Sequence, residues 1–293
     1  MTRTIPVLII GVISISFAAI FIRFCDDMPS MTIAGFRFVI ASLILLLISC
    51  FKKHNFGDLS VKEFFWCTVS GAFLALHMIL WIIALKMTSV ASAVVLVTTN
   101  PIFVAIFSYV LLKERQSKEL MIGIVLSFVG SAVIAIGDGG ISGSMVLDKT
   151  ALTGDILALL GAVMASGYLI IGSKMREKMD TFSYILIVYT ITAAIVLMVV
   201  FAGGYPVLGF KTSSYISVAL LAIVPQLLGH TSFNWVLKHI KTSMVAITIL
   251  GEPIGATILA YFFFKETISF LQFLGILGIF TAIVIASRKG AKN

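Results

Sequence analysis

Long apolar runs separated by short polar connections divide the chain into ten similar pieces. Each run holds about 20 residues, the length that a helix needs to cross a bilayer core about 30 Å thick. Lipid offers no partner to backbone amides and carbonyls, so segments of this kind cross it as helices. We therefore predict an all-α polytopic membrane protein with ten transmembrane helices, approximately Ile5–Phe24, Thr32–Phe51, Phe64–Leu85, Ala91–Leu112, Leu120–Ile136, Gly154–Ile171, Phe182–Phe201, Ile216–Leu237, Met244–Phe264 and Phe270–Ser287.

Composition agrees with a lipid environment. Hydrophobic residues make up 60% of the chain and charged residues 12%, against about 25% charged residues in a soluble domain. The net charge of +8 comes from short basic clusters between the apolar runs, not from a basic patch with interleaved aromatic residues, so we expect no nucleic-acid partner. Cys25, Cys50 and Cys67 lack metal-ligand spacing, and we expect neither a metal nor a cofactor.

Basic residues in the connections predict the orientation. Fifteen Lys and Arg residues lie on the side of the N-terminus and five lie on the other side. Because basic loops stay in the cytoplasm, both termini are predicted to be cytoplasmic in a cell-membrane protein. The first run follows Arg3 and no convincing small-x-small cleavage site comes after it, so we predict an uncleaved first helix instead of a signal peptide.

One stretch of the chain occurs twice, as Thr88–Phe128 and Thr242–Phe280. The segments beginning at Pro101 and Pro253 share ten identities in 28 aligned pairs. Trp81 also matches Trp235, and Gly11 matches Gly161 more weakly. At one constant offset of 152, the matched residues are Pro101, Tyr109, Lys113, Glu114, Ser117 and Gly123 with Pro253, Tyr261, Lys265, Glu266, Ser269 and Gly275.

The duplication divides the chain into two halves. We predict a first repeat at residues 1–137, a flexible Gly-, Ser- and Asp-rich linker at 138–153, and a second repeat at 154–293. Five helices in each half is an odd number, so the second repeat enters the membrane in the opposite sense. Inverted repeats of this kind are typical of secondary transporters, which open one central site alternately to each side.

Several motifs resemble the EamA-type branch of the drug/metabolite transporter superfamily. They are Gly-Phe-Arg-Phe at 35–38, Asn100-Pro101 followed by Leu-Lys-Glu at 112–114, and Glu252-Pro253 followed by Phe-Lys-Glu at 264–266. The resemblance covers nearly the whole chain. It implies a basket of ten helices with a central cavity that moves small metabolites, often outward. The chain departs from the strongest form of the pattern at Asn100, where the other half carries Glu252.

Polar residues inside predicted spans are candidates for substrate binding, because they are costly in lipid and face a bundle interior or a wet cavity. Gln226, His230 and Asn234 recur every four residues and form one stripe on an α-helix, and His77 shares a face with Trp81. Hydrogen bonds between helices are the competing explanation for the amides and histidines. The tryptophans, Trp81 and Trp235, are candidates either for stacking on substrate or for a membrane-interface belt.

Arg37 and Glu252 are strongly charged residues inside predicted spans. Glu252 is a candidate for a coupling proton, another ion or a substrate amine, and Arg37 for a substrate carboxylate. A structural ion pair between the two is the alternative. Asn100 takes the position of Glu252 in the first half and joins the candidate binding residues.

The duplicated prolines and tyrosines are candidates for moving parts. Pro101 and Pro253 lack an amide hydrogen and are predicted to kink equivalent helices, which suits a gate. Tyr109 and Tyr261 are predicted to serve in packing or gating. The glycines Gly71, Gly123, Gly130 and Gly275 allow close helix approach, with ordinary packing as the alternative.

The leading hypothesis is a secondary transporter that exports a small metabolite, such as an amino acid or a related amphipathic compound, and not an enzyme. No P-loop, dinucleotide-binding glycine pattern, HExxH or nucleophile elbow is present, so a gradient would supply the energy, with protons as a candidate coupling ion. The alternatives are an intramembrane enzyme acting on a lipid-linked substrate through His77, His230 and Glu252, an uncoupled facilitator, and a channel. A monomer is compatible with the sequence, which leaves the oligomeric state open.

Overall fold

The computed structural model describes residues 4–52, 59–113, 117–138, 149–265, 267 and 269–290, and these residues form an all-helical fold without strands. Its elements are α1 (Thr4–Ser16), α2 (Ala18–Phe24), α3 (Ser30–Lys52), α4 (Val61–Met87), α5 (Val90–Val97), α6 (Asn100–Leu112), α7 (Lys118–Asp138), α8 (Lys149–Lys178), α9 (Thr181–Ala202), α10 (Thr212–Leu221), the π-helix η1 (Ala222–His230), α11 (Thr231–Val236), α12 (Thr242–Ile249), α13 (Glu252–Phe264) and α14 (Phe270–Gly290).

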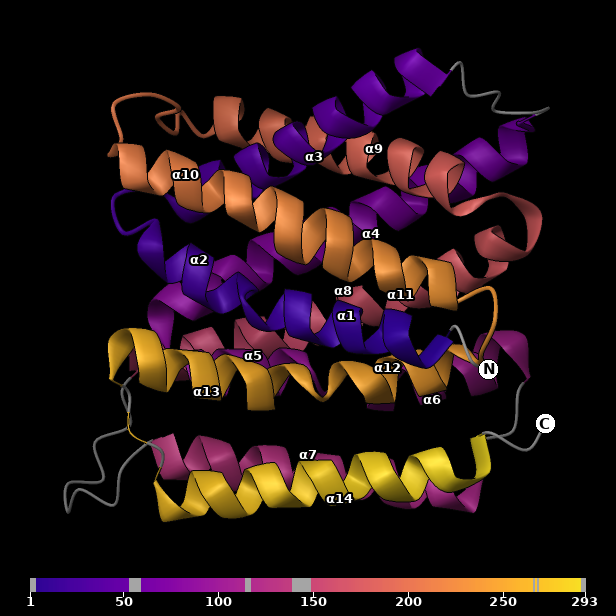
Figure 1. Ribbon diagram of the computed structural model, residues 1–293, viewed down its shortest axis with the longest axis vertical. Helices are drawn as coiled ribbons and strands as arrows, with labels where there is room; N and C mark the ends of the chain where they lie inside the picture. The colour runs from indigo at the N-terminus through magenta and orange to yellow at the C-terminus, as the bar shows by residue number, and fades with distance from the viewer. Residues whose placement is uncertain are drawn as a thin grey trace.

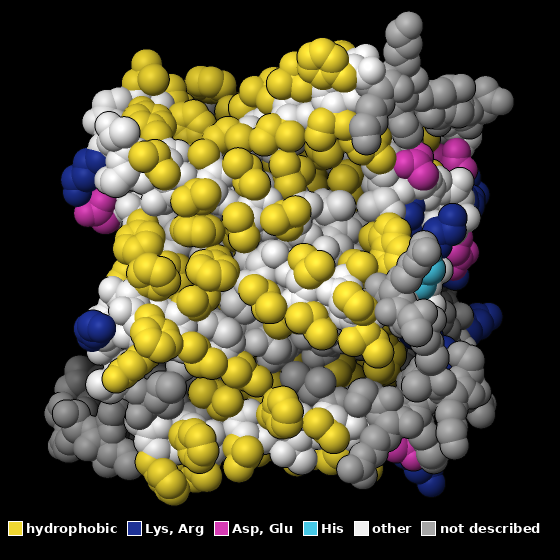
Figure 2. Space-filling view, in the orientation of Figure 1, with side chains coloured by type: hydrophobic (Ala, Val, Ile, Leu, Met, Phe, Trp, Pro, Cys, Tyr) yellow, Lys and Arg dark blue, Asp and Glu magenta, His cyan; other side chains and the backbone are white. Residues whose placement is uncertain are grey.

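The helices lie side by side, so their ends form two opposite faces of the molecule (Figure 1). Apolar side chains cover the surface between these faces, and charged side chains collect at the two edges (Figure 2). Eight segments of the described chain are long and apolar enough to cross a bilayer. This arrangement is that of a multi-pass membrane protein.

The remaining two predicted runs correspond to α7 and α14, which are 21 residues long each. These two helices pack against one another and form a layer beside the rest of the bundle (Figure 1). Gly130 makes the close approach possible, because a Cβ atom there would lie 2.7 Å from the Gly275 carbonyl oxygen. Small residues at such crossings let helix backbones meet in lipid.

Four of the predicted spans are interrupted. The span Thr4–Phe24 breaks at Phe17, between α1 and α2. The duplicated spans break between α5 and α6 and between α12 and α13, and in both cases a proline, Pro101 or Pro253, follows the break as the second residue of the new helix. Proline is well tolerated there, since the first amides of a helix have no intrahelical partner.

The fourth interruption is a change of helix type. The segment Thr212–Val236 begins as α10, widens into η1, which contains Pro225, and continues as α11. A π-helix has more than 3.6 residues per turn, so residues four apart no longer lie above one another. The α-helical spacing assumed for the stripe of Gln226, His230 and Asn234 therefore does not hold through η1.

The connection between the halves ends earlier than predicted. Helix α8 begins at Lys149, ahead of the predicted start at Gly154. The rest of that connection, residues 139–148, lies outside the described residues, as do Glu114 and Glu266 of the duplicated turn.

Candidate functional site

A cavity lies where the two duplicated spans are interrupted. Both breaks contribute to its wall, Thr98 and Asn100 from the first half and Ile249 and Glu252 from the second. Its other lining residues come from α1 to α5, α8, η1 and α11, and they are Ile15, Ala18, Arg37, His77, Met78, Trp81, Val97, Ala165, Tyr168, Leu169, His230 and Phe233.

Hydroxyl groups donate to backbone carbonyl oxygens at the first of these breaks. Thr98 and Thr99 donate from Oγ1 to the carbonyl oxygens of Val95 and Leu96, at 2.9 and 2.7 Å. Ser166 on α8 donates to the carbonyl oxygen of Asn100 at 3.1 Å. Irregular backbone at membrane depth is tolerated when protein or water satisfies it in this way.

Each of the two prolines leaves a backbone carbonyl group without its usual helical donor near the cavity. Pro101 and Pro253 have no amide hydrogen to donate to the carbonyl groups four residues earlier, which belong to Val97 and Ile249. Both residues line the cavity. The positive ends of the α6 and α13 dipoles meet there as well, because these helices begin at Asn100 and Glu252.

Arg37 supplies the cavity with a cation whose donors are not all used. Its side chain is fully buried, and Nε donates to Oε1 of Gln226 at 2.8 Å. Nη1 and Nη2 have no hydrogen-bond partner among the described residues. A guanidinium held through Nε presents its other two nitrogens together, in the geometry that matches a carboxylate.

Trp81 and His77 form the adjoining wall on α4. The two rings are stacked 6.4 Å apart between centroids, with an interplanar angle of 7°. Nδ1 of His77 lies 2.9 Å from the carbonyl oxygen of Gly161, so this nitrogen carries the proton in that bond. Nε1 of Trp81 is a buried donor without a partner in the described structure.

Asn100 and Glu252 provide hydrogen-bond acceptors from equivalent positions of the two halves. Both are buried, with 4% and 8% of their surface exposed. Oδ1 of Asn100 has no hydrogen-bond partner among the described residues. Glu252 and Arg37 line the same cavity, yet no described ion pair with a separation of 4.0 Å or less joins them. The direct ion pair offered as the structural alternative is absent from this conformation.

The cavity is small in this conformation. About 50 Å³ is open to the centres of water-sized molecules, which is room for a few waters, since one water needs about 10–15 Å³ by this measure. A metabolite requires more space than this. We therefore infer that the cavity widens when a metabolite binds.

Several predicted site residues lie outside this lining. Gln226 accepts the hydrogen bond from Nε of Arg37, and Nδ2 of Asn234 donates to the hydroxyl of Tyr168 at 2.5 Å. Trp235 stacks on His239 with centroids 4.1 Å apart. Tyr109 and Tyr261 are 63% and 48% exposed on the apolar surface. The two tyrosines therefore lie outside the cavity, and Pro101 and Pro253 border the breaks without lining it.

Tyr168 was missed by sequence reasoning, although the repeat contained a signal for it. The weak match of Gly11 with Gly161 has an offset of 150. At the same offset Ala18 corresponds to Tyr168, and both line the cavity. The same holds at offset 152 for Asn100 with Glu252. Equivalent positions of the repeat thus meet at one site.

Known proteins resemble this chain in sequence and fold. The EamA-like transporter family matches residues 2–136 and 152–288. The chain is 29% identical over 276 residues to the uncharacterized transporter YetK of Bacillus subtilis (strain 168), covering 88% of this chain and 80% of YetK. It is 26% identical over 246 residues to the uncharacterized transporter YdfC of the same organism, covering 83% and 77%.

More distant matches extend to animals and to a solved structure. Solute carrier family 35 member G1 of Homo sapiens is 24% identical over 283 residues, covering 94% of this chain and 75% of that protein. A solved crystal structure superposes with a TM-score of 0.77 at 16% identity, covering 98% of this chain and 97% of the other. The last match concerns the fold alone.

Proposed function

The chain belongs to the EamA-like transporter family, and we propose that it is a secondary transporter that carries a small zwitterionic metabolite through the central cavity. The observation behind this proposal is that Arg37 and Glu252, two buried groups of opposite charge, line one cavity without a direct ion pair. Separated charges buried in a membrane protein are unfavourable by several kcal/mol each. A substrate carrying both charges would satisfy both groups.

The substrate contacts follow from the unpartnered atoms. Nη1 and Nη2 of Arg37, together with Nε1 of Trp81, would donate to a substrate carboxylate. The carboxylate of Glu252 and Oδ1 of Asn100 would accept from a substrate ammonium group. Apolar neighbours such as Ile15, Met78 and Phe233 favour an amino acid or a related compound with an apolar side chain.

The mechanism that we propose is alternating access between two inverted repeats, residues 1–137 and 154–293, with ten transmembrane helices in total. Breaks at corresponding positions of α5–α6 and α12–α13 support this assignment, since discontinuous helices frame the central site of many such transporters. Lys and Arg in the connections support cytoplasmic termini in the cell membrane. Export is the proposed direction, in line with the behaviour common in this family.

Glu252 is also the proposed coupling group. A carboxylate that can bind either a proton or a substrate amine couples the two by competition, because the same oxygens serve both. The enzyme alternative has less support: His77 has its Nδ1 committed to Gly161, and the acid-base candidates line a cavity deep in the bundle, where a lipid-linked substrate cannot reach them without the same opening of the helices.

Uptake into proteoliposomes tests the proposal. Labelled amino acids would be offered with and without a pH gradient, next to an amino acid methyl ester, which lacks the carboxylate, and a des-amino acid, which lacks the amine. We expect the intact zwitterion to move at least about tenfold faster than either analogue, because each lost charge-assisted hydrogen bond is worth about 1.5–3 kcal/mol.

Glu252→Gln tests the proposed coupling group, whose carboxylate also accepts from the substrate amine, with Glu177→Gln as the matched control on an exposed carboxylate of α8. Accumulation that requires both the gradient and Glu252 establishes a proton-coupled carrier. Equilibration without the gradient, and identical in Glu252→Gln, would make the protein a facilitator. No movement of any compound by a folded protein would overturn the proposed substrate class.

A further inference from the structure

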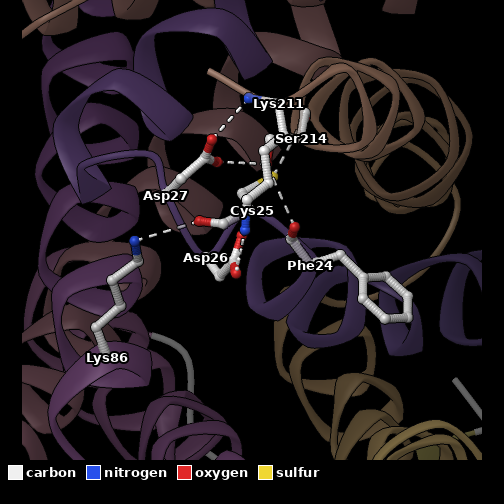
Figure 3. Close-up of polar contacts among 7 residues, drawn as sticks. All are labelled: Phe24, Cys25, Asp26, Asp27, Lys86, Lys211 and Ser214. Carbon is white, nitrogen blue, oxygen red and sulfur yellow. Dashed lines mark hydrogen bonds and ion pairs between the residues drawn. The ribbon is translucent and has the colours of Figure 1, made fainter. Parts of the chain in front are cut away.

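One end of the molecule carries a cluster of polar contacts between the two halves of the chain (Figure 3). The carboxylate of Asp27, in the connection between α2 and α3, accepts from the backbone amide of Lys211 at 2.7 Å and from the hydroxyl of Ser214 at 2.5 Å. Asp26 beside it pairs with Nζ of Lys211 at 2.9 Å. We call Asp26, Asp27, Lys211 and Ser214 the polar latch.

Asp27 caps the N-terminus of α10 from a distant part of the chain. Lys211 is the N-cap residue of α10 and provides no side-chain cap itself. Asp27 binds the amide of this N-cap residue and the hydroxyl in the first turn, and its negative charge faces the positive end of the helix dipole. Ser214 is fully buried, so its bond to Asp27 is more protected from water than the exposed Asp26–Lys211 pair. Exposed ion pairs of that kind contribute little.

Two further contacts lie at the same end, the first between the halves and the second within the first half. Oγ1 of Thr32 donates to the carbonyl oxygen of Pro206 at 2.9 Å, and Nζ of Lys86 donates to the carbonyl oxygens of Cys25 and Met28. At the opposite end the buried cation Arg176 bonds to Asn234, Met179 and Thr181, all within the second half. Of the described ion pairs, the one that joins the halves lies in the latch.

The latch and the cavity connect the same two elements. Asp27 and Arg37 belong to the region around α3, and Ser214 and Gln226 belong to the segment α10–η1–α11. Arg37 bonds to Gln226 beside the cavity, and Asp27 bonds to Ser214 at the end of the bundle. Displacing α10–η1–α11 from α3 would therefore change both the cavity, through the Arg37–Gln226 bond, and the end of the molecule that carries the latch, through the Asp27–Ser214 bond.

We propose that Asp27 holds a gate, and that capping of α10 by Asp27 keeps the cavity closed toward the end of the molecule where Asp26 and Lys211 lie. This inference rests on the alternating access proposed above. The latch opens when the cavity faces that side and closes when it faces the other. Asp27 carries the closure, and the Asp26–Lys211 pair adds little to it.

Cys25 offers a direct readout, because it lies beneath the latch with none of its surface exposed. Its thiol contacts the carbonyl oxygen of Ser214 at 3.5 Å, and burial raises its pKa to about 12. Thiol reagents attack the thiolate, so Cys25 reacts slowly while the latch is closed. Opening exposes the thiol and restores an ordinary pKa.

The test is labelling of Cys25 as the single cysteine, in a Cys50→Ser, Cys67→Ala background, by a membrane-impermeant maleimide in right-side-out and inside-out vesicles. We expect Asp27→Ala to raise the labelling rate about tenfold, since it removes two charge-assisted hydrogen bonds, and Ser214→Ala to raise it less. Asp26→Ala should change it by less than about threefold. Lys149→Gln, an exposed lysine on α8, is the matched control and should leave the rate unchanged.

No substrate is needed for this measurement, so its outcome is independent of the uptake experiment. Asp27→Ala also removes a charge that helps to raise the pKa of Cys25, whereas Ser214→Ala keeps it. Faster labelling of both variants from one side supports the gate and identifies the side that it closes, including a side opposite to the predicted orientation. Equal rates in Asp27→Ala, Ser214→Ala and the background would overturn it. If Asp27→Ala does not fold, Asp27→Asn replaces it, because this variant removes only the charge. We expect Asp27→Asn to give a labelling rate between those of the background and Asp27→Ala. A labelling rate equal to the background in Asp27→Asn would also overturn the gate.

Discussion

Lys113 and Lys265 end α6 and α13 in the same left-handed backbone conformation, with φ of 55° and 58°. They are 152 positions apart, and in the part of the chain that the structure describes no other residue except glycine has a positive φ. A left-handed residue after a helix is usually glycine, because a Cβ atom is strained there. That both copies place lysine in this conformation indicates that the duplicated turn has kept its geometry.

The two lysines therefore predict a gain in stability on substitution by glycine. Relief of left-handed strain of about 1–2 kcal/mol, less the entropy that glycine loses on folding, leaves a net gain of about 0.5–1 kcal/mol for Lys113→Gly and for Lys265→Gly. Lys174→Gly, inside the regular helix α8 with a half-exposed side chain, is the control and should lose about 1 kcal/mol, because glycine is unfavourable in a helix interior. Unfolding midpoints in mixed detergent micelles measure the difference. A loss of stability in all three variants would contradict the prediction.

The helices could be predicted from sequence, because in lipid a run of about 20 apolar residues has few alternatives to a helix. The breaks could be located too, since Pro101 and Pro253 cannot continue the hydrogen bonding of the preceding turn. The π-helix around Pro225 could not be predicted, because a proline inside a span is equally compatible with a simple kink. The predicted stripe of Gln226, His230 and Asn234 assumed α-helical spacing, which η1 does not have, yet Gln226 and Asn234 are buried and His230 lines the cavity.

Partners far apart in sequence were also beyond prediction. Arg37 was expected to bind substrate or to pair with Glu252, but its Nε bonds to Gln226, 189 residues away. The sequence analysis assigned no role to Asp27 or Lys211, and only the folded chain brings them together. Such contacts depend on how the two halves are placed against one another. The pattern of apolar residues in a single sequence does not specify that placement.

Packing of α7 against α14 provides a second prediction. A Cβ atom at Gly130 would lie 2.7 Å from the Gly275 carbonyl oxygen and 3.2 Å from the Ile279 amide nitrogen. Since both are backbone atoms, the helices must separate in Gly130→Ala, and we expect a loss of about 1–3 kcal/mol. Gly278 on the facing helix is the control, because a Cβ atom there would meet its nearest neighbour at 3.6 Å. Equal unfolding midpoints for Gly130→Ala and Gly278→Ala would show that the helices do not approach as closely as described.

The bond between Gln226 and Arg37 yields a third prediction. Gln226→Ala leaves Nε of Arg37 buried without a partner, at a loss of about 1–3 kcal/mol of stability, and frees the guanidinium to turn. Gln226→Glu restores a partner but offers Arg37 a carboxylate in place of the substrate. We expect Gln226→Glu to recover stability without recovering transport, and Arg37→Lys to lose transport because an ammonium group cannot bind a carboxylate bidentately. Uptake assays beside unfolding midpoints separate these effects, and full transport by Gln226→Glu would remove Arg37 from the substrate site.

The polar latch should be insensitive to pH between 5 and 8. The hydrogen bond from the Lys211 side chain lowers the pKa of Asp26, those from Ser214 and the Lys211 amide lower the pKa of Asp27, and the bond to Asp26 raises the pKa of Lys211. Carboxylates with lowered pKa values favour the closed latch above their ordinary pKa of about 3.9 and lose this contribution only as the pH falls below it. Neither carboxylate takes up a proton on opening between pH 5 and 8, so the opening equilibrium stays constant there. The measurement is the labelling rate of Cys25 divided by that of a free cysteine peptide at each pH, which cancels the titration of the thiol in the open state. A ratio that rises between pH 8 and pH 5 would mean that another group, protonated in that range, opens the gate.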